Sequence, residues 1–245
     1  YYKVYPRSVR QYPGGTAFMA ADEQGCDKLY SCGEKAPFEG LRREAGGTVF
    51  YECELSAHNA AVLRELFPFC GPQKVLSRKC TFGTGDRLGL ATPGHIAAVR
   101  KYDATPVLAQ QSMRELSLTG RTFRDVIDDV TFYVFREGYT GGYGADGDHL
   151  KTMEEIEAAI GSGCTMITLD LSEHIHRPEE NRGDVDDAVK AYYLDRAFPL
   201  EGGYEIRFSE RELRDAVTIY GEALAFASQA AQRFFNQEDA PAELE

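Results

Sequence analysis

The stretch GYGADGDHLK, from Gly142 to Lys151, places two aspartates and a histidine among three glycines. Carboxylates and imidazoles are the side chains that most often move protons or bind metal ions in enzymes. Asp146, Asp148 and His149 come where an apolar, strand-like run gives out. Aspartates that only accept hydrogen bonds from turn amides account for the two acids equally well. The stretch is therefore a candidate for proton transfer or metal binding, with a solvated loop as the alternative.

Polar side chains also follow three other strand-like runs, near 77–82, 106–111 and 165–171. In sheets of parallel strands, ligands bind at the carboxyl ends of the strands. Polarity of the surface alone would scatter such residues, whereas here they collect at four strand ends. The candidate site residues are Asp86, Arg87, Gln110, Gln111, Arg114, Asp146, Asp148, His149, Asp170 and His174.

Two of these strand ends have competing interpretations. His174 and His176 are alternate residues, which point the same way on an extended strand and could bind one metal ion. They could equally be the start of a polar insertion. The sequence GTGDRLG (83–89) resembles a phosphate-binding loop but lacks both the G-x-G-x-x-G spacing and the P-loop lysine. Phosphate binding is therefore not favoured.

The elements that carry these residues alternate between strands and helices. The run PVLAQQS precedes a helix that Thr122 and Asp125 would cap and Gly138 would end, and GYGAD (142–146) precedes a helix capped by Thr152. Four strand–helix units in a row predict parallel strands with right-handed crossovers. Either a doubly wound sheet or half of a (β/α)8 barrel fits, because a complete barrel needs eight such units in about 250 residues. A barrel predicts strands in sequential order.

The chain is expected to have two domains. Residues 1–72 contain strand-like runs at 16–22, 28–32 and 48–55 and a helix that Ser56 would cap, which predicts a small α/β domain. The prolines and glycine of 67–74 indicate a boundary, and 73–245 would form the second domain. An insertion at 175–208 would end in a hairpin, before a last helix that starts at Ser209 and buries Leu213, Val217, Tyr220, Leu224 and Phe234.

Composition narrows the partners. The net charge of −12 disfavours nucleic acid as a binding partner. No apolar run approaches the roughly 20 residues that are needed to span a bilayer. The six cysteines form no C-x-x-C pair, which is typical of reduced thiols in a cytoplasmic protein. The chain opens with tyrosine, so a processed or trimmed chain is expected.

Four segments together resemble the tagaturonate epimerase family, in the family's order over roughly residues 75–235. They are FGTGDRLGLATPGHIAAV, LAQQSMREL, TGRTFRDVIDDVTFYVFREGYTGGYGADGDHLK and TLDLSEH. Residues 1–72 resemble that family's amino-terminal region only loosely. The resemblance implies metal-dependent interconversion of tagaturonate and fructuronate, and it favours the barrel over the doubly wound sheet.

The resemblance also implies roles for single residues. Asp148 matches the family's proton acceptor and His149 matches a ligand of its divalent metal cation, whose identity is open. His174 matches a histidine to which no role can be assigned, and His176 departs from the family pattern. The proton donor and the remaining metal ligands are expected beyond residue 245, with AELE (242–245) beginning a fifth strand or being a cloning remnant. This chain alone is then expected to be inactive.

The implied chemistry fits these residue types. The carbon inverted in the reaction lies beta to the ketone, so its hydrogen is not acidic, and a retro-aldol opening and re-addition is the expected route. The metal would stabilise the enolate as a Lewis acid, and Asp148 would take the hydroxyl proton. Arg87 and Arg114 would bind the uronate carboxylate, with Gln110 and Gln111 as further substrate contacts.

Two alternatives stay open at this point. The chain could be a non-catalytic, sugar-acid-binding or inactive fragment, or another metal-dependent aldolase or hydrolase on the same barrel. The expected partner is a small sugar acid, with a second copy of the chain as a possible addition. Nucleic acid and membrane are not expected.

Overall fold

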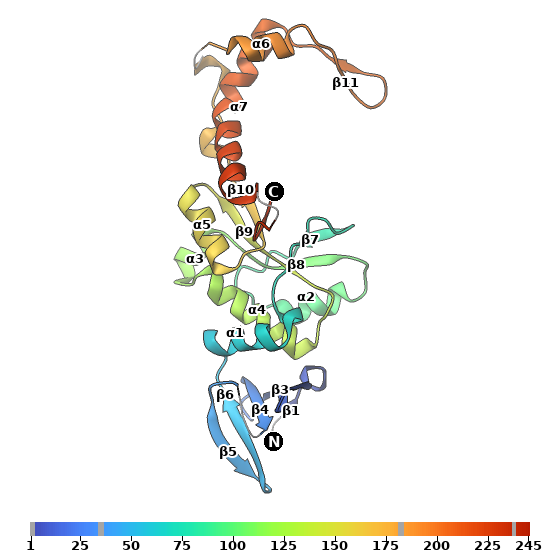
Figure 1. Cartoon of the computed structure of the whole chain (residues 1–245), viewed down its shortest axis with the longest axis vertical. Coiled ribbons are helices and arrows are strands. Elements are labelled where there is room, and N and C mark those ends of the chain that lie inside the picture. Colours follow the sequence, from blue (N-terminus) through green and yellow to red (C-terminus); the bar gives the residue numbers. More distant parts are fainter. Residues whose placement is uncertain (1–2, 34–36, 181–183, 237–238) are drawn as a thin grey trace. The chain divides into compact units, whose positions relative to one another are not determined.

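The computed structural model describes residues 3–33, 37–180, 184–236 and 239–245. The chain forms two compact units (Figure 1). The first unit comprises residues 1–168 together with 239–245, and the second comprises 169–238. The boundary predicted near residue 72 falls inside the first unit.

An antiparallel sheet begins the first unit. Its strands are paired in the order β1-β3-β4-β6-β5, with β2 also on β3. The strands are β1 (Lys3–Val4), β2 (Arg10–Tyr12), β3 (Gly15–Ala21), β4 (Asp27–Gly33), β5 (Leu41–Ala45) and β6 (Thr48–Cys53). The three predicted strands are confirmed as β3, β4 and β6, whereas β1, β2 and β5 were not predicted. Short 3-10 turns lie at Pro6–Ser8 and Pro68–Cys70.

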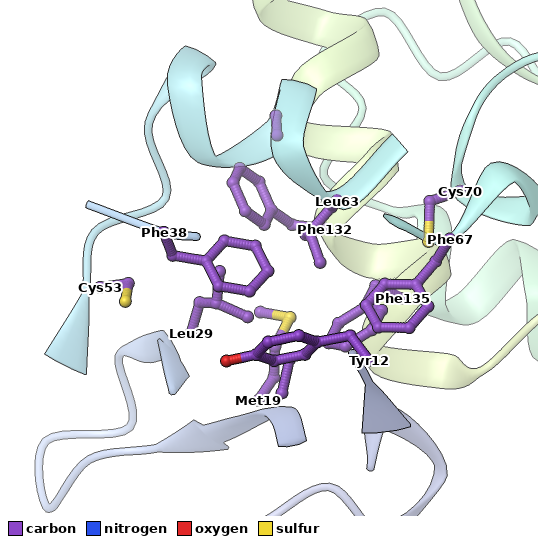
Figure 2. Close-up of a cluster of buried hydrophobic side chains, with 12 residues drawn as sticks. Tyr12, Met19, Leu29, Phe38, Cys53, Leu63, Phe67, Cys70, Phe132 and Phe135 are labelled. Atoms are coloured by element: carbon purple, nitrogen blue, oxygen red, sulfur yellow. The ribbon is translucent and has the colours of Figure 1, made fainter. Parts of the chain in front are cut away.

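Helix α1 (Ala57–Leu66) follows this sheet and begins as predicted, with the Ser56 side chain accepting from the Asn59 N–H. Together with α4 (Phe123–Glu137), it covers the sheet. Figure 2 shows the buried cluster that they share, in which Met19 and Leu29 of the sheet meet Leu63 of α1 and Phe132 of α4. This shared core explains why residues 1–72 do not separate as a compact unit of their own.

A second sheet of five strands carries the candidate residues. Its order is β13-β10-β9-β8-β7, and the pairs β7–β8, β8–β9 and β10–β13 are parallel. The strands are β7 (Thr81–Gly83), β8 (Thr105–Gln111), β9 (Gly144–Leu150), β10 (Met166–Leu169) and β13 (Glu243–Leu244). The predicted sequential order is confirmed, and so is the strand at the AELE segment.

Two strand bounds differ from the prediction. The run at 77–82 forms a strand only at Thr81–Gly83. The third strand was expected to end at residue 146, but β9 continues to Leu150, so Asp148 and His149 lie within the strand. The glycines and acids of this stretch suggested a loop, yet parallel pairing to β8 extends from Gly144 to Gly147. Neighbouring strands thus override the weak intrinsic preference of these residues.

Helices connect the parallel strands. They are α2 (Thr92–Val99), α3 (Met113–Thr119), α4 and α5 (Met153–Ser162). The capping boxes predicted at Thr122 and Thr152 are present, and Gly138 ends α4 with a positive φ of 56°. Each box satisfies amides that the first helical turn leaves unpaired, so the helices begin close to the strand ends.

The second unit contains the predicted insertion and the last helix. A 3-10 turn at Ser172–His174 and another at Pro178–Glu180 precede α6 (Asp187–Tyr193), which was not predicted. The predicted hairpin is confirmed by the pairing of β11 (Phe198–Pro199) with β12 (Glu205–Ile206). The helix α7 (Glu210–Ala230) begins with the Ser209–Glu212 capping box and continues as a π-helical turn at Ala231–Phe235.

The apolar face predicted for α7 is only partly buried. Leu213 is buried, but Tyr220 is 50% exposed and Leu224 is 66% exposed, so the prediction was wrong for these two. Helical spacing predicts which residues share a face but cannot show whether anything covers that face. Among the helices that the structure describes, none is both long and apolar enough to cross a membrane.

Candidate functional site

Arg87 and Asp148 meet at the carboxyl end of the parallel sheet. Arg87 follows β7 in the loop that leads to α2, and Asp148 lies near the end of β9. The Arg87 Nη1 donates to Asp148 Oδ2 and, at 3.0 Å, to the Gln110 carbonyl oxygen. Asp148 is 4% exposed. The guanidinium compensates part of the cost of removing this carboxylate from water.

Asp146 is a second buried carboxyl, two residues before Asp148 on the same strand. It is paired in register with Gln110 of β8. Gln110 Nε2 donates to Asp146 Oδ2 at 3.2 Å, and Thr168 Oγ1 of β10 lies 3.1 Å from each carboxyl oxygen. Burial, followed by the charge of Asp148, raises the pKa of Asp146 to about 7. The two aspartates of this strand thus differ in environment, one held by a cation and the other by neutral donors.

His149 has an unusual backbone conformation. Its φ is 57°, the left-handed region, and it is the one non-glycine residue with positive φ in the part of the chain that the structure describes. Successive side chains of a regular strand point to opposite faces. The left-handed turn at His149 departs from that alternation, and its Nε2 lies 3.7 Å from Asp148 Oδ1. The imidazole is exposed while its neighbouring carboxylate is buried.

The glycines of this stretch serve packing more than turning. Of the glycines at 141, 142, 144 and 147, only Gly142 has a positive φ, of 81°. A Cβ at Gly147 would lie 2.9 Å from the Cβ of Ala159 and 3.1 Å from Ile167 Cδ1. Gly147 therefore allows α5 to approach the strand.

Asp86 and Gln110 hold the loop that carries Arg87. Asp86 is buried and accepts from the backbone N–H groups of three loop residues, Leu88, Gly89 and Ala91. Gln110 Oε1 accepts from the Gly85 N–H at 3.2 Å. A Cβ at Gly83 would lie 2.4 Å from that same Oε1, so glycine is needed for this approach. The side chains of Asp86 and Gln110 thus hold the backbone of the loop that carries Arg87.

Other predicted residues lie apart from these contacts. Arg114 is exposed on α3 and has no ion-pair partner among the described residues. Gln111 is fully buried, and neither its Oε1 nor its Nε2 has a hydrogen-bond partner within the described ranges. Gln111 follows Gln110 on the strand and therefore faces the opposite side.

Asp170 and His174 belong to the second unit. The Asp170 carboxylate accepts from the Ser172 N–H at 2.9 Å. His174 Nδ1 lies 3.1 Å from Glu222 Oε1, and His176 Nε2 lies 2.8 Å from Glu222 Oε2. The two imidazoles thus share one glutamate of α7. Of the two interpretations of this pair, the extended strand is not present at His174, because Ser172–His174 is a 3-10 turn.

The residues present do not form a complete metal site. Within residues 3–33, 37–180, 184–236 and 239–245, no group of three or more His, Cys, Asp or Glu side chains could hold a metal ion. Catalytic zinc, for comparison, takes about three protein ligands and keeps one open position. His149 is an exposed imidazole next to the Asp148 carboxyl, which is one part of such a ligand set. No step of the chemistry is therefore assigned to a metal here.

Sequence reasoning missed one side chain at this site and misjudged another elsewhere in the same sheet. Thr168, which donates to Asp146, lies inside an apolar strand and was not singled out. Its position two residues before Asp170 indicates that both lie on the same face of the strand, which was the available signal. Glu243 was treated only as part of a strand, yet its carboxylate accepts from the Val75 and Leu76 N–H groups at 2.8 Å.

The family model for tagaturonate epimerase (UxaE) matches residues 5–245. The chain belongs to the tagaturonate epimerase family. The match includes the amino-terminal sheet, where the sequence motifs gave only a loose resemblance.

Known members of the tagaturonate epimerase family are similar over nearly the whole chain. A tagaturonate/fructuronate epimerase of Thermotoga maritima is 39% identical over 237 residues, which is 91% of this chain and 49% of the relative. Crystal structures of a fructuronate-tagaturonate epimerase from Cohnella laeviribosi, native and with one glycerol, are 38% identical with a TM-score of 0.88. They cover 99% of this chain and 52% of those chains. The chain thus spans about half the length of these relatives.

Proposed function

We propose that this protein is a metal-dependent epimerase that interconverts tagaturonate and fructuronate. The observation that carries the proposal is the buried Asp148 held by Arg87 at the carboxyl end of a parallel sheet. Family membership supplies the substrate class, and the site supplies an acid–base group and a cation that suit it. We also propose that the sheet is the first part of a (β/α)8 barrel, because its strands follow one another in sequential order.

Arg87 is proposed to bind the carboxylate of the hexuronate. The Arg87 side chain is about one-third exposed, and its guanidinium already binds one carboxylate, that of Asp148. A planar guanidinium suits bidentate binding of a carboxylate. When the substrate carboxylate accepts hydrogen bonds from this guanidinium, the charge-assisted hydrogen bond between Arg87 and Asp148 is weakened. Asp148 is then free to accept a hydrogen bond from a hydroxyl of the substrate.

Asp148 is proposed to remove the proton of the hydroxyl on the carbon that is inverted. The bond between that carbon and its neighbour opens, which leaves an aldehyde and an enolate. Rotation of the aldehyde and re-addition of the enolate on its other face form the same bond again, and Asp148 returns the proton. Atoms and charge balance, and no oxidant is needed. Gln110 and Thr168, the two neutral donors to Asp146, keep the Asp146 carboxyl in place during these steps.

A divalent cation at His149 stays a prediction of the family resemblance. When bound, such a cation would polarise the ketone as a Lewis acid. His149 would be one ligand, since its imidazole is exposed and next to the proposed base. Arg114 and Gln111 stay predicted substrate contacts without support from the described contacts. Cytoplasmic location and a homo-oligomer likewise stay predictions.

Product analysis tests the proposal. The full-length protein is incubated with tagaturonate, with and without added divalent cation, and the sugar acids are separated and identified by NMR. Fructuronate is the expected product, with conversion lost in a chelator and restored by metal. Accumulation of shorter fragments would instead identify an aldolase. A folded, metal-supplied protein that converts neither hexuronate would show that the chain belongs to a binding protein.

A further inference from the structure

The loop between β7 and α2 wraps around one buried aspartate. The Asp86 side chain is 6% exposed, its Oδ2 lies 3.9 Å from His95 Nδ1, and none of the lysines and arginines that the structure describes is paired with it. Its Oδ1 accepts from Leu88 N at 3.1 Å and from Gly89 N at 2.9 Å, and its Oδ2 accepts from Ala91 N at 2.8 Å. Three backbone donors thus converge on one carboxylate. Such an arrangement sets the path of the chain on both sides of Arg87 and Leu88.

We propose that Asp86 is the positioning residue for Arg87, directing its guanidinium toward Asp148 and toward the carboxylate of the substrate. This inference rests on the proposed function, because it assigns Arg87 to the uronate carboxylate. Asp86 itself reaches neither group. It acts through the backbone from which the Arg87 side chain starts.

Arg87 needs such support because its own contacts are few. Its Nη1 donates to the Gln110 carbonyl and to Asp148, and its side chain is 35% exposed. A long side chain with several rotatable bonds holds one geometry only when its origin is fixed. Displacement of a binding group by about 1 Å can cost roughly 100-fold in rate.

The rest of the loop is bound to its surroundings in the same region. Thr92 Oγ1 donates to the Gly89 carbonyl at 2.9 Å, and Arg121 donates to the Leu88 carbonyl at 2.6 Å. Gly89 has a φ of 74° and a Cβ there would lie 2.9 Å from the Val126 carbonyl oxygen. These contacts bind the loop, on the far side of Leu88, to the start of α2 and to the segment that precedes α4. Asp86 holds the part of the loop that bears Arg87.

The carboxylate form of Asp86 is what the loop requires. An asparagine has one acceptor oxygen, and its NH2 group would face the N–H of either Ala91 or of Leu88 and Gly89. One or more of these amides would then lose its acceptor in a buried place. Asp86→Asn therefore loosens the loop while changing almost no volume.

A double-mutant cycle in the full-length protein tests the inference. Asp86→Asn, Arg87→Met and the double variant are compared for kcat and KM with tagaturonate. We expect kcat/KM to fall roughly 100-fold in each single variant, mostly through KM, and the double variant to be within about twofold of Arg87→Met alone. Losses that multiply in the double variant would overturn the inference, because Asp86 would then act independently of Arg87.

Two further measurements separate this inference from a general effect on folding. Asp22→Asn is the matched control, since Asp22 Oδ1 also accepts two backbone N–H groups, those of Gln24 and Cys26. Its kcat/KM should equal that of the parent. Should Asp86→Asn fail to fold, Thr92→Val removes a neighbouring bond of the same loop, and its smaller loss of kcat/KM should likewise vanish in the Arg87→Met background. An additive Thr92→Val effect would overturn the inference.

The proposed function and this inference can fail separately. A parent protein that does not epimerise either hexuronate overturns the function, and the crystal structure of Asp86→Asn then still tests the positioning. The inference predicts that the Arg87 guanidinium leaves Asp148 in that structure. An unchanged Arg87–Asp148 pair would contradict it.

Discussion

Arg87 and Asp148, which are 61 residues apart in the chain, form an ion pair at the carboxyl end of the parallel sheet. Neither residue is placed there by its own element alone. The loop after β7 carries the cation, β9 carries the carboxylate, and Gln110 of the intervening strand accepts a hydrogen bond from the same arginine. The pair therefore exists only when three neighbouring strands have their native order.

Replacement of Arg87 tests what this ion pair contributes. Arg87→Met leaves Asp148 buried without its cation, so we expect a loss of roughly 1–2 kcal/mol in the free energy of unfolding, discounted because the arginine is partly exposed. Urea unfolding of parent and variant measures this loss. Arg207→Met is the matched control, because its pair with Glu205 is exposed on both sides. An equal effect of both substitutions would show that burial of Asp148 is unimportant.

The pKa of Asp146 predicts a pH dependence of stability. Burial raises this pKa to about 7 from 3.8, so the folded protein keeps a proton that the unfolded chain releases. The free energy of unfolding therefore falls as pH rises from about 4 to about 7 and is flat above that range. Asp146→Asn removes this term, and the variant should gain about 3 kcal/mol relative to the parent between pH 5 and pH 8.

Urea unfolding at several pH values measures the gain for Asp146→Asn. Asp187→Asn serves as control, because that aspartate is fully exposed, and its stability should follow the parent at each pH. If the free energy of unfolding depended on pH in the same way for Asp146→Asn and the parent, this would contradict a proton held at Asp146.

The positive φ of His149 predicts that glycine is more stabilising than alanine at this position, the reverse of their usual order in a helix. Glycine adopts this conformation without strain, so His149→Gly should be more stable than His149→Ala by about 1 kcal/mol. His58, an exposed residue in α1, provides the matched pair, and there alanine should exceed glycine by about 1 kcal/mol. Thermal unfolding of the four variants measures both differences. If the alanine variant were the more stable one at both positions, residue 149 would not have a positive φ.

Gly147 tests the close approach of α5 to β9. A Cβ at this position would lie within 3.1 Å of Ala159, Leu150 and Ile167, so Gly147→Ala should cost about 1–3 kcal/mol of stability. Gly161, on the same helix α5, has nothing within 4 Å of its Cβ position. Gly161→Ala should therefore stabilise the protein by roughly 0.5–1 kcal/mol. Chemical denaturation measures both, and a neutral Gly147→Ala would show that the strand and helix are farther apart.

The strand order and several of the helices were predictable from local patterns. Thr122 with Asp125, Thr152 with Glu155 and Ser209 with Glu212 form capping boxes that depend only on residues three apart. The alternation of strands and helices then restricts the sheet to parallel neighbours. The candidate residues on the first three strand ends could be found because parallel strands bring their carboxyl ends to one edge of the sheet.

Other features depend on contacts that no local pattern reports. The extension of β9 through Gly147 follows from pairing with β8, although glycine and aspartate disfavour strands. The exposure of Leu224 and Tyr220 depends on what lies beside α7. The positive φ of His149 has no signature in a single sequence, since histidine is tolerated there but not required.

The central claim is that Asp148 is the base of an epimerisation, and Asp148→Asn in the full-length protein tests it most directly. An amide cannot take a proton, so interconversion of tagaturonate and fructuronate should fall roughly 100- to 10,000-fold. Metal content and the unfolding midpoint are measured on the same sample and should show a folded, metal-bound protein, whereas His149→Ala should lose metal and activity together. Near-normal turnover by Asp148→Asn would contradict the assignment and leave this part of β9 with a structural role alone.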